Sequence, residues 1–152
     1  MWSSKPSDRV TIWRQFRNSI GTKVLGDAIA ETAAYWSKAP ISAQHLAPDL
    51  VEDWPDPWTL LHSGFYDDLS ITLGMVYTLA LSDHFEAIKD DCFIEILIHP
   101  GTKQVFNTAW LSEGKYVLNY EYNNVVSQDV ISDELEVRYK YTLLDLKIDS
   151  YR

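Results

Sequence analysis

The sequence has little cysteine, little glycine and no hydrophobic run long enough to cross a membrane. Its one cysteine, Cys92, excludes an internal disulfide and favours a reducing compartment. Its six glycines form no glycine-rich loop of the kind that cradles phosphate groups. The most apolar stretch, from Leu69 to Leu81, is about 13 residues long, whereas a bilayer needs roughly 20. Because the N-terminus also lacks an apolar segment of signal-peptide length, we expect neither export by a signal peptide nor a membrane segment.

Basic residues are also scarce, since 13 Lys and Arg stand against 22 Asp and Glu, which gives a net charge of −9. A chain with this charge repels phosphate, so nucleic acid is not an expected partner. The acidic excess is concentrated in residues 41–100. Three interpretations of that stretch stay open: a solvated face, a docking surface for a basic partner, or a mimic of nucleic-acid phosphate.

Apolar and aromatic residues, by contrast, are plentiful. Hydrophobic residues make up 46% of the chain, enough for one folded domain that spans residues 1–152. There are six Trp and nine Tyr, and such side chains bury large areas while keeping a polar end that needs a partner. We expect some of these rings to contact another protein.

Residues 1–40 have the pattern of a helical hairpin. Val10, Trp13, Phe16 and Ile20 recur at spacings of three and four, and a second stripe of this kind runs through residues 25–36. Three arginines lie mostly off the first apolar face: Arg9, Arg14 and Arg17. We expect them to pair with acidic side chains, either in the same chain or in a second copy. Self-association into a homo-oligomer is therefore a hypothesis.

Residues 41–64 read as an irregular connector rich in proline and tryptophan, because each proline disfavours helix in the residue before it. Its centre is Asp53-Trp54-Pro55-Asp56-Pro57-Trp58. The two indoles can close one end of the core or serve as exposed anchors for a partner. A short helix is expected to start at Asp56 or Pro57 and to end near Gly64.

Residues 65–85 predict a central helix. Asp67 and Asp68 suit a helix N-terminus, where carboxylates complement the helix dipole. The residues that follow are apolar around most of the helix circumference, which is typical of a helix buried on all sides.

Residues 92–141 predict an antiparallel sheet. Ile94, Ile96 and Ile98 alternate with other residues at the period of a strand, and turns follow near residues 100–103 and 112–115. A third strand would place Tyr116, Leu118, Tyr120 and Tyr122 on one face, and a fourth would run from Leu135 to Tyr141. Helices before strands indicate an α+β fold, with the central helix packed on a β-meander.

Three segments carry a family resemblance: Trp54-Pro55-Asp56-Pro57-Trp58, residues 73–79 and residues 114–119. They resemble small uncharacterised proteins of contractile-tailed bacteriophages, including phages of cyanobacteria. The resemblance implies a phage-encoded protein found in the host cytoplasm or the virion, and it implies no activity.

The chain is also similar to transglutaminase-like and papain-like folds. In those folds a helix presents a nucleophilic cysteine at its N-terminus, against an antiparallel sheet that carries a histidine and an acid. Here the start of the central helix holds Asp67 and Asp68 instead. Cys92 lies beside Asp90 and Asp91, whose charge disfavours a thiolate, so we expect a buried, inert thiol. An enzyme would have to use Cys92 or a carboxylate together with His99.

The sequence shows no spacing typical of a metal site, and neither a metal ion nor another cofactor is expected. Our leading expectation is a protein that binds protein, as a virion or assembly component or as a factor acting on a host protein. An inactive transglutaminase-like or hydrolase enzyme and an acidic nucleic-acid mimic are the alternatives. The expected contact residues are Trp54, Trp58, Tyr116, Tyr120 and Tyr122, with Asp53 and Asp56 beside them.

Overall fold

Helices occupy the first part of the chain and strands the second, in a computed structural model that describes residues 1–43 and 45–152. The α+β prediction is confirmed. The helices are α1 (Pro6–Gly21), α2 (Leu25–Trp36), α3 (Pro57–Ser63), α4 (Asp68–Ala80) and α5 (Phe85–Ile88). The strands are β1 (Phe93–Ile98), β2 (Val105–Leu111), β3 (Tyr116–Glu121), β4 (Asn124–Val126) and β5 (Glu136–Thr142).

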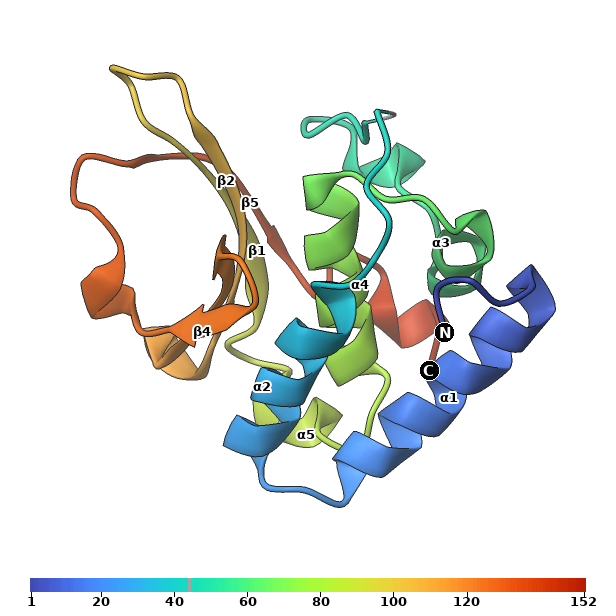
Figure 1. Ribbon diagram of the computed structural model, residues 1–152. Coiled ribbons are helices and arrows are strands. Elements are labelled where there is room, and N and C mark those ends of the chain that lie inside the picture. Colours follow the sequence, from blue (N-terminus) through green and yellow to red (C-terminus); the bar gives the residue numbers. More distant parts are fainter. Residues whose placement is uncertain (44) are drawn as a thin grey trace.

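Helix α4 is the centre of the molecule, as its sequence predicts. Every residue from Leu69 to Ala80 is buried, and α4 contacts helices α2, α3 and α5 as well as strands β1 and β2 (Figure 1). Gly74 allows the close approach of α2, because a Cβ atom at this position would lie 2.4 Å from the ring of Trp36. The helix is shorter than the predicted span of 65–85 at both ends, since it begins at Asp68 and a turn separates its end from the short helix α5.

A buried threonine joins three helices. The Thr78 hydroxyl of α4 accepts hydrogen bonds from the indole nitrogens of Trp13 in α1 and Trp36 in α2, each at 2.9 Å. The same hydroxyl donates to the carbonyl of Gly74 at 2.7 Å. A buried indole N–H needs a hydrogen-bond acceptor, and these two indoles share the Thr78 hydroxyl.

Two arginines of α1 have partners other than the acidic ones expected. Arg9 is buried, and its guanidinium donates to the carbonyls of Leu61 and His62 at the end of α3. Arg17 donates to the carbonyl of Leu81 at the end of α4. Carbonyls at a helix C-terminus have no partner within their own helix, so these arginines cap neighbouring helices.

The connector contains the short helix that the sequence predicts. Asp56 caps α3 by accepting from the backbone nitrogen of Thr59 at 2.8 Å, and Gly64 ends the helix in the left-handed region at φ 76°. A glycine reaches that region without steric cost.

The sheet is a meander only as far as its fourth strand. All neighbouring strands are antiparallel, in the order β4-β3-β2-β1-β5. β4 was not predicted, and the predicted fourth strand is the fifth, which returns to pair with β1. The pattern of residues along a strand indicates which face is buried, but not which neighbour it pairs with.

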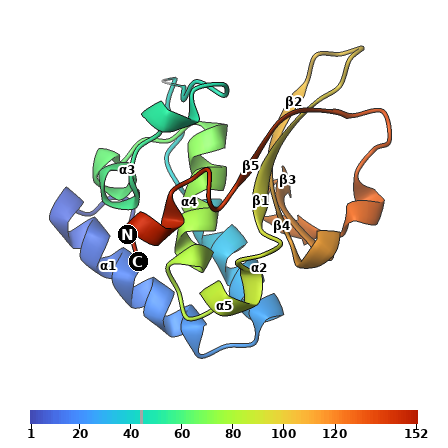
Figure 2. The same ribbon diagram turned by 180° about the vertical axis from the view of Figure 1, so that it is seen from behind.

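Residues 127–135 therefore have to cross the sheet from one edge to the other. They do so on the face away from the helices, as both views show (Figures 1 and 2). We call this the outer face. In the part of the chain that the structure describes, no helix is both long enough and apolar enough to span a membrane.

Candidate functional site

The first turn of α4 holds two aspartates with different roles. Asp67 is the N-cap, 5% exposed, and accepts from the backbone nitrogens of Ser70 at 2.9 Å and Leu46 at 3.0 Å. The hydroxyl of Ser70 donates to it as well. Asp67 is thus fully occupied in starting the helix.

Asp68 faces the sheet and is held by two asparagines. Its Oδ2 accepts from Nδ2 of Asn107 in β2 at 2.9 Å, and its Oδ1 accepts from Nδ2 of Asn119 in β3 at 3.1 Å. Thr72, one turn further along α4, accepts from Asn119 at 2.8 Å and donates to the Asn107 carbonyl at 2.5 Å. We call Asp68, Thr72, Asn107 and Asn119 the Asp68 cluster.

The backbone of β3 is bent to place Asn119. The residue has φ 62°, in the left-handed region, and the pairing of β3 with β4 shifts between Leu118 and Glu121. Asparagine tolerates this conformation better than most residues with a side chain. Unusual backbone of this kind persists where the surrounding contacts fix it.

The Asp68 cluster is built for hydrogen bonding. Its two amide side chains neither gain nor lose a proton near neutral pH, and Asp68 and Thr72 are its other side chains. The cluster therefore provides no thiol and no imidazole.

The comparisons with known proteins concern the fold. No family model matches the chain, and no curated protein matches it in sequence. Solved structures of LapG from Legionella pneumophila do match, each with a TM-score of 0.69 and 12% identity. The match covers 92% of this chain and 77% of the calcium-bound LapG, and 90% of this chain and 74% of the EGTA-treated form. This chain therefore shares the overall fold of LapG.

The Asp68 cluster lies where the start of α4 meets strands β2 and β3 of the sheet. The resemblance implied a cysteine at the helix and a histidine and an acid on the strands. Here the helix start has Asp68, and the two facing strands have Asn107 and Asn119. Sequence reasoning identified the helix start but missed both asparagines, because no local motif marks them and only the strand register brings them to Asp68.

Cys92 and His99 do not meet. They flank β1 at opposite ends, so about 20 Å of extended chain separates them. Cys92 is 3% exposed, and burial, with a contribution from Asp91, raises the pKa of its thiol to about 12. His99 Nε2 lies 2.8 Å from Glu134 Oε2, and its Nδ1 accepts from the backbone nitrogens of Gly101 and Thr102.

The two connector tryptophans differ in exposure. Trp54 is 8% exposed, donates to the carbonyl of Ala47 at 2.8 Å and packs edge-on against Tyr141, so it closes the core. Trp58 is 39% exposed and packs edge-on against Tyr151. Asp53 is exposed in a 3-10 turn, and Asp56 is used as the α3 cap. Of these expected contact residues, Trp58 and Asp53 are free to meet a partner.

The expected row of tyrosines on one face of β3 is wrong. Tyr116 lies on the helix side, where its hydroxyl approaches Gly26 of α2. Tyr120 stacks on Phe106 at 5.0 Å between ring centroids, and Tyr122 is 79% exposed beyond the end of the strand. The bend at Asn119 breaks the alternation on which the prediction depended.

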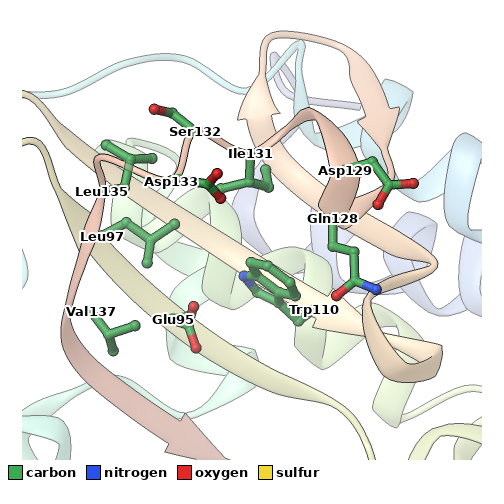
Figure 3. A pocket seen from close by; sticks show the side chains of 10 residues that line it. All are labelled: Glu95, Leu97, Trp110, Gln128, Asp129, Ile131, Ser132, Asp133, Leu135 and Val137. Atoms are coloured by element: carbon green, nitrogen blue, oxygen red, sulfur yellow. The ribbon is translucent and has the colours of Figure 1, made fainter.

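Apart from the Asp68 cluster, the outer face of the sheet has a concave site under the crossing segment of residues 127–135. It has a volume of about 540 Å³. Glu95, Leu97 and Trp110 form its floor, and the crossing segment contributes Asp129, Ile131 and Asp133 (Figure 3). We call it the outer groove; it is lined by Glu95, Leu97, Trp110, Gln128, Asp129, Ile131, Ser132, Asp133, Leu135 and Val137.

The described residues include no group of three or more His, Cys, Asp and Glu side chains arranged to hold a metal ion.

Proposed function

We propose that this chain is a non-catalytic protein-binding domain built on a transglutaminase-like fold. The observation that carries the proposal is the Asp68 cluster. Nucleophilic catalysis needs an activated nucleophile with a base within hydrogen-bond reach. At the helix start both carboxylate oxygens of Asp68 are instead engaged by amides that cannot act as acid or base.

The enzyme alternative based on Cys92 and His99 has little chemical support. A thiol with a pKa near 12 is almost entirely protonated at neutral pH, and the thiolate is the reactive form. A general base has to approach its proton donor to roughly 3 Å, whereas β1 keeps the two residues far apart.

The same proposal includes a phage-encoded origin, with a role in the virion, in its assembly or in acting on a host protein. It is supported by the sequence resemblance. Mass spectrometry of purified virions separates a virion component from a factor that acts in the host cytoplasm. Absence of any stable protein partner in infected cells would count against both roles.

Thiol labelling of the native protein tests the non-catalytic part. We expect Cys92 to react with iodoacetamide only after unfolding in urea. Leu144→Cys is a suitable control, because Leu144 is 82% exposed and a cysteine there should react at once in the native protein. Rapid modification of Cys92 in the folded wild type would overturn this part of the proposal.

A further inference from the structure

We infer that the outer groove binds a basic, extended segment of a partner protein, with a lysine or arginine side chain seated between Trp110 and the carboxylates of Glu95 and Asp133. The inference rests on the proposed protein-binding function and specifies the chemistry of the partner.

The groove exists because of the sheet topology. β4 and β5 are at opposite edges, so residues 127–135 pass over β3, β2 and β1. A 3-10 turn at Gln128–Val130 holds part of this segment above the sheet. Leu97 is only 3% exposed on the outer face, so the floor combines the apolar Leu97 and Trp110 with the carboxylate of Glu95.

The carboxylate of Glu95 is available to a ligand. Among the described residues it has no hydrogen-bond donor and no cation within 4.0 Å. Its neighbour in the register is Lys140 of β5, whose ammonium lies 4.1 Å from the centre of the Phe93 ring. Burial raises the pKa of Glu95, and Lys140 opposes this only in part. A second cation beside Glu95 would offset the free-energy cost of burying its negative charge.

Trp110 provides a fixed aromatic surface. Its indole nitrogen donates to the hydroxyl of Thr108 at 2.9 Å, and that hydroxyl donates to the Glu95 carbonyl at 2.7 Å. The ring is therefore held in place on the floor beside Glu95 (Figure 3). Cations bind over tryptophan faces, and a guanidinium can stack there while it pairs with a carboxylate.

The apolar lining suits the rest of such a side chain. Lysine and arginine bury their methylene stems against apolar surface and keep the charge at a polar end. Leu97 and Val137 would contact the stem, and Asp129 and Asp133 stand at the opposite wall. A purely apolar or an acidic ligand would leave Glu95 unpaired in the groove.

A second cavity of mixed charge adjoins the outer groove. A neighbouring cavity of about 440 Å³ shares Trp110 and Gln128 with the outer groove. Asp90, Asp91 and Glu113 line it together with Lys89 and Lys140, and Oδ1 of Asp91 is buried with no hydrogen-bond partner among the described residues. The unpartnered oxygen of Asp91 is an acceptor that a second basic residue of the same chain segment could reach.

Fluorescence anisotropy with a labelled arginine-rich peptide tests the inference. The comparison peptides replace every arginine by glutamine or by glutamate. We expect the arginine peptide alone to bind, and the double variant Glu95→Gln/Asp133→Asn to weaken binding at least tenfold. The control Glu52→Gln/Asp53→Asn removes the same charge from an exposed turn outside the groove. It should change binding by less than threefold.

Equal losses in the two double variants would mean attraction by net charge alone and would overturn the inference. NMR gives a second readout that does not depend on variants. The indole N–H signal of Trp110 should shift on adding the arginine peptide, while those of the buried Trp13 and Trp36 stay in place. No shift at Trp110 would equally contradict the inference.

The outcomes separate this inference from the proposed function. If no basic peptide binds but a protein partner cross-links elsewhere on the surface, the groove assignment fails and the protein-binding function stands. If the arginine peptide binds and Cys92 is reactive in the native protein, the non-catalytic proposal fails and the groove assignment stands. A concentration-dependent dimer that Glu95→Gln/Asp133→Asn abolishes would show that a second copy occupies the groove, against our assignment.

Discussion

Replacing Thr78 by valine tests the polar junction of the three helices. Valine keeps the shape of threonine but has no hydroxyl, so the indole nitrogens of Trp13 and Trp36 would both lose their acceptor. Both indoles and Thr78 are completely buried, so water cannot replace the lost hydroxyl as an acceptor. A buried donor left without a partner costs about 1–3 kcal/mol.

Two such donors give an expected loss of about 2–6 kcal/mol in the free energy of unfolding for Thr78→Val. That is a large share of the roughly 5–15 kcal/mol that stabilises a typical domain. At about 2–4 °C per kcal/mol for a chain of this size, the melting temperature should fall by at least 4 °C. Urea unfolding followed by tryptophan fluorescence measures the free energy directly.

Thr78→Ser is the matched control, because serine keeps the hydroxyl and loses one methyl group. It should cost about 1 kcal/mol. A loss below 1 kcal/mol for Thr78→Val, or an equal loss for both variants, would show that the shared acceptor is not what stabilises the junction.

Substitutions at three further positions test other parts of the account. Gly74→Ala should destabilise the fold by about 1–3 kcal/mol or more in urea unfolding, because the new Cβ would overlap the Trp36 ring; a neutral effect would contradict the packing of α2 on α4. Asn119→Gly should be less destabilising than Asn119→Ala by about 1 kcal/mol, since both lose the amide but only alanine is strained at φ 62°; equal melting temperatures would argue against that backbone. Burial raises the pKa of the Glu95 carboxyl in the folded state. The folded protein therefore binds the carboxyl proton more tightly than the unfolded chain does. The stability that this proton contributes is present at low pH and is lost as the pH rises through the folded-state pKa. Glu95→Gln should therefore melt higher than wild type at pH 7 and lose that advantage near pH 4; an advantage that is the same at both pH values would refute this reasoning.

The sequence predicted the elements better than their arrangement. The helix at Asp68–Ala80 was predictable because apolar residues surround it, and β1 because its isoleucines alternate. The position of β5 beside β1 was not predictable, because its exposed residues pair through backbone groups that leave no pattern in the sequence.

The same limit applies to the candidate sites. The inert setting of Cys92 could be inferred from its acidic neighbours, and the structure adds that burial is the larger cause. Asn107 and Asn119 reach Asp68 only through strand register, and the outer groove needs the long crossing to β5. Tyr116 and Tyr120 were misplaced because a single left-handed residue between them changes the alternation.

Site-specific photo-crosslinking in the cells where the protein is made tests the central claim most directly. The cross-linker would replace Val130, which is 50% exposed on the crossing segment, or Tyr122, which is 79% exposed. A third variant would carry it at the buried Ile29, as the negative control. The account predicts a covalent adduct of defined mass with another protein from at least one exposed position and none from position 29. The absence of adducts from both exposed positions would contradict it.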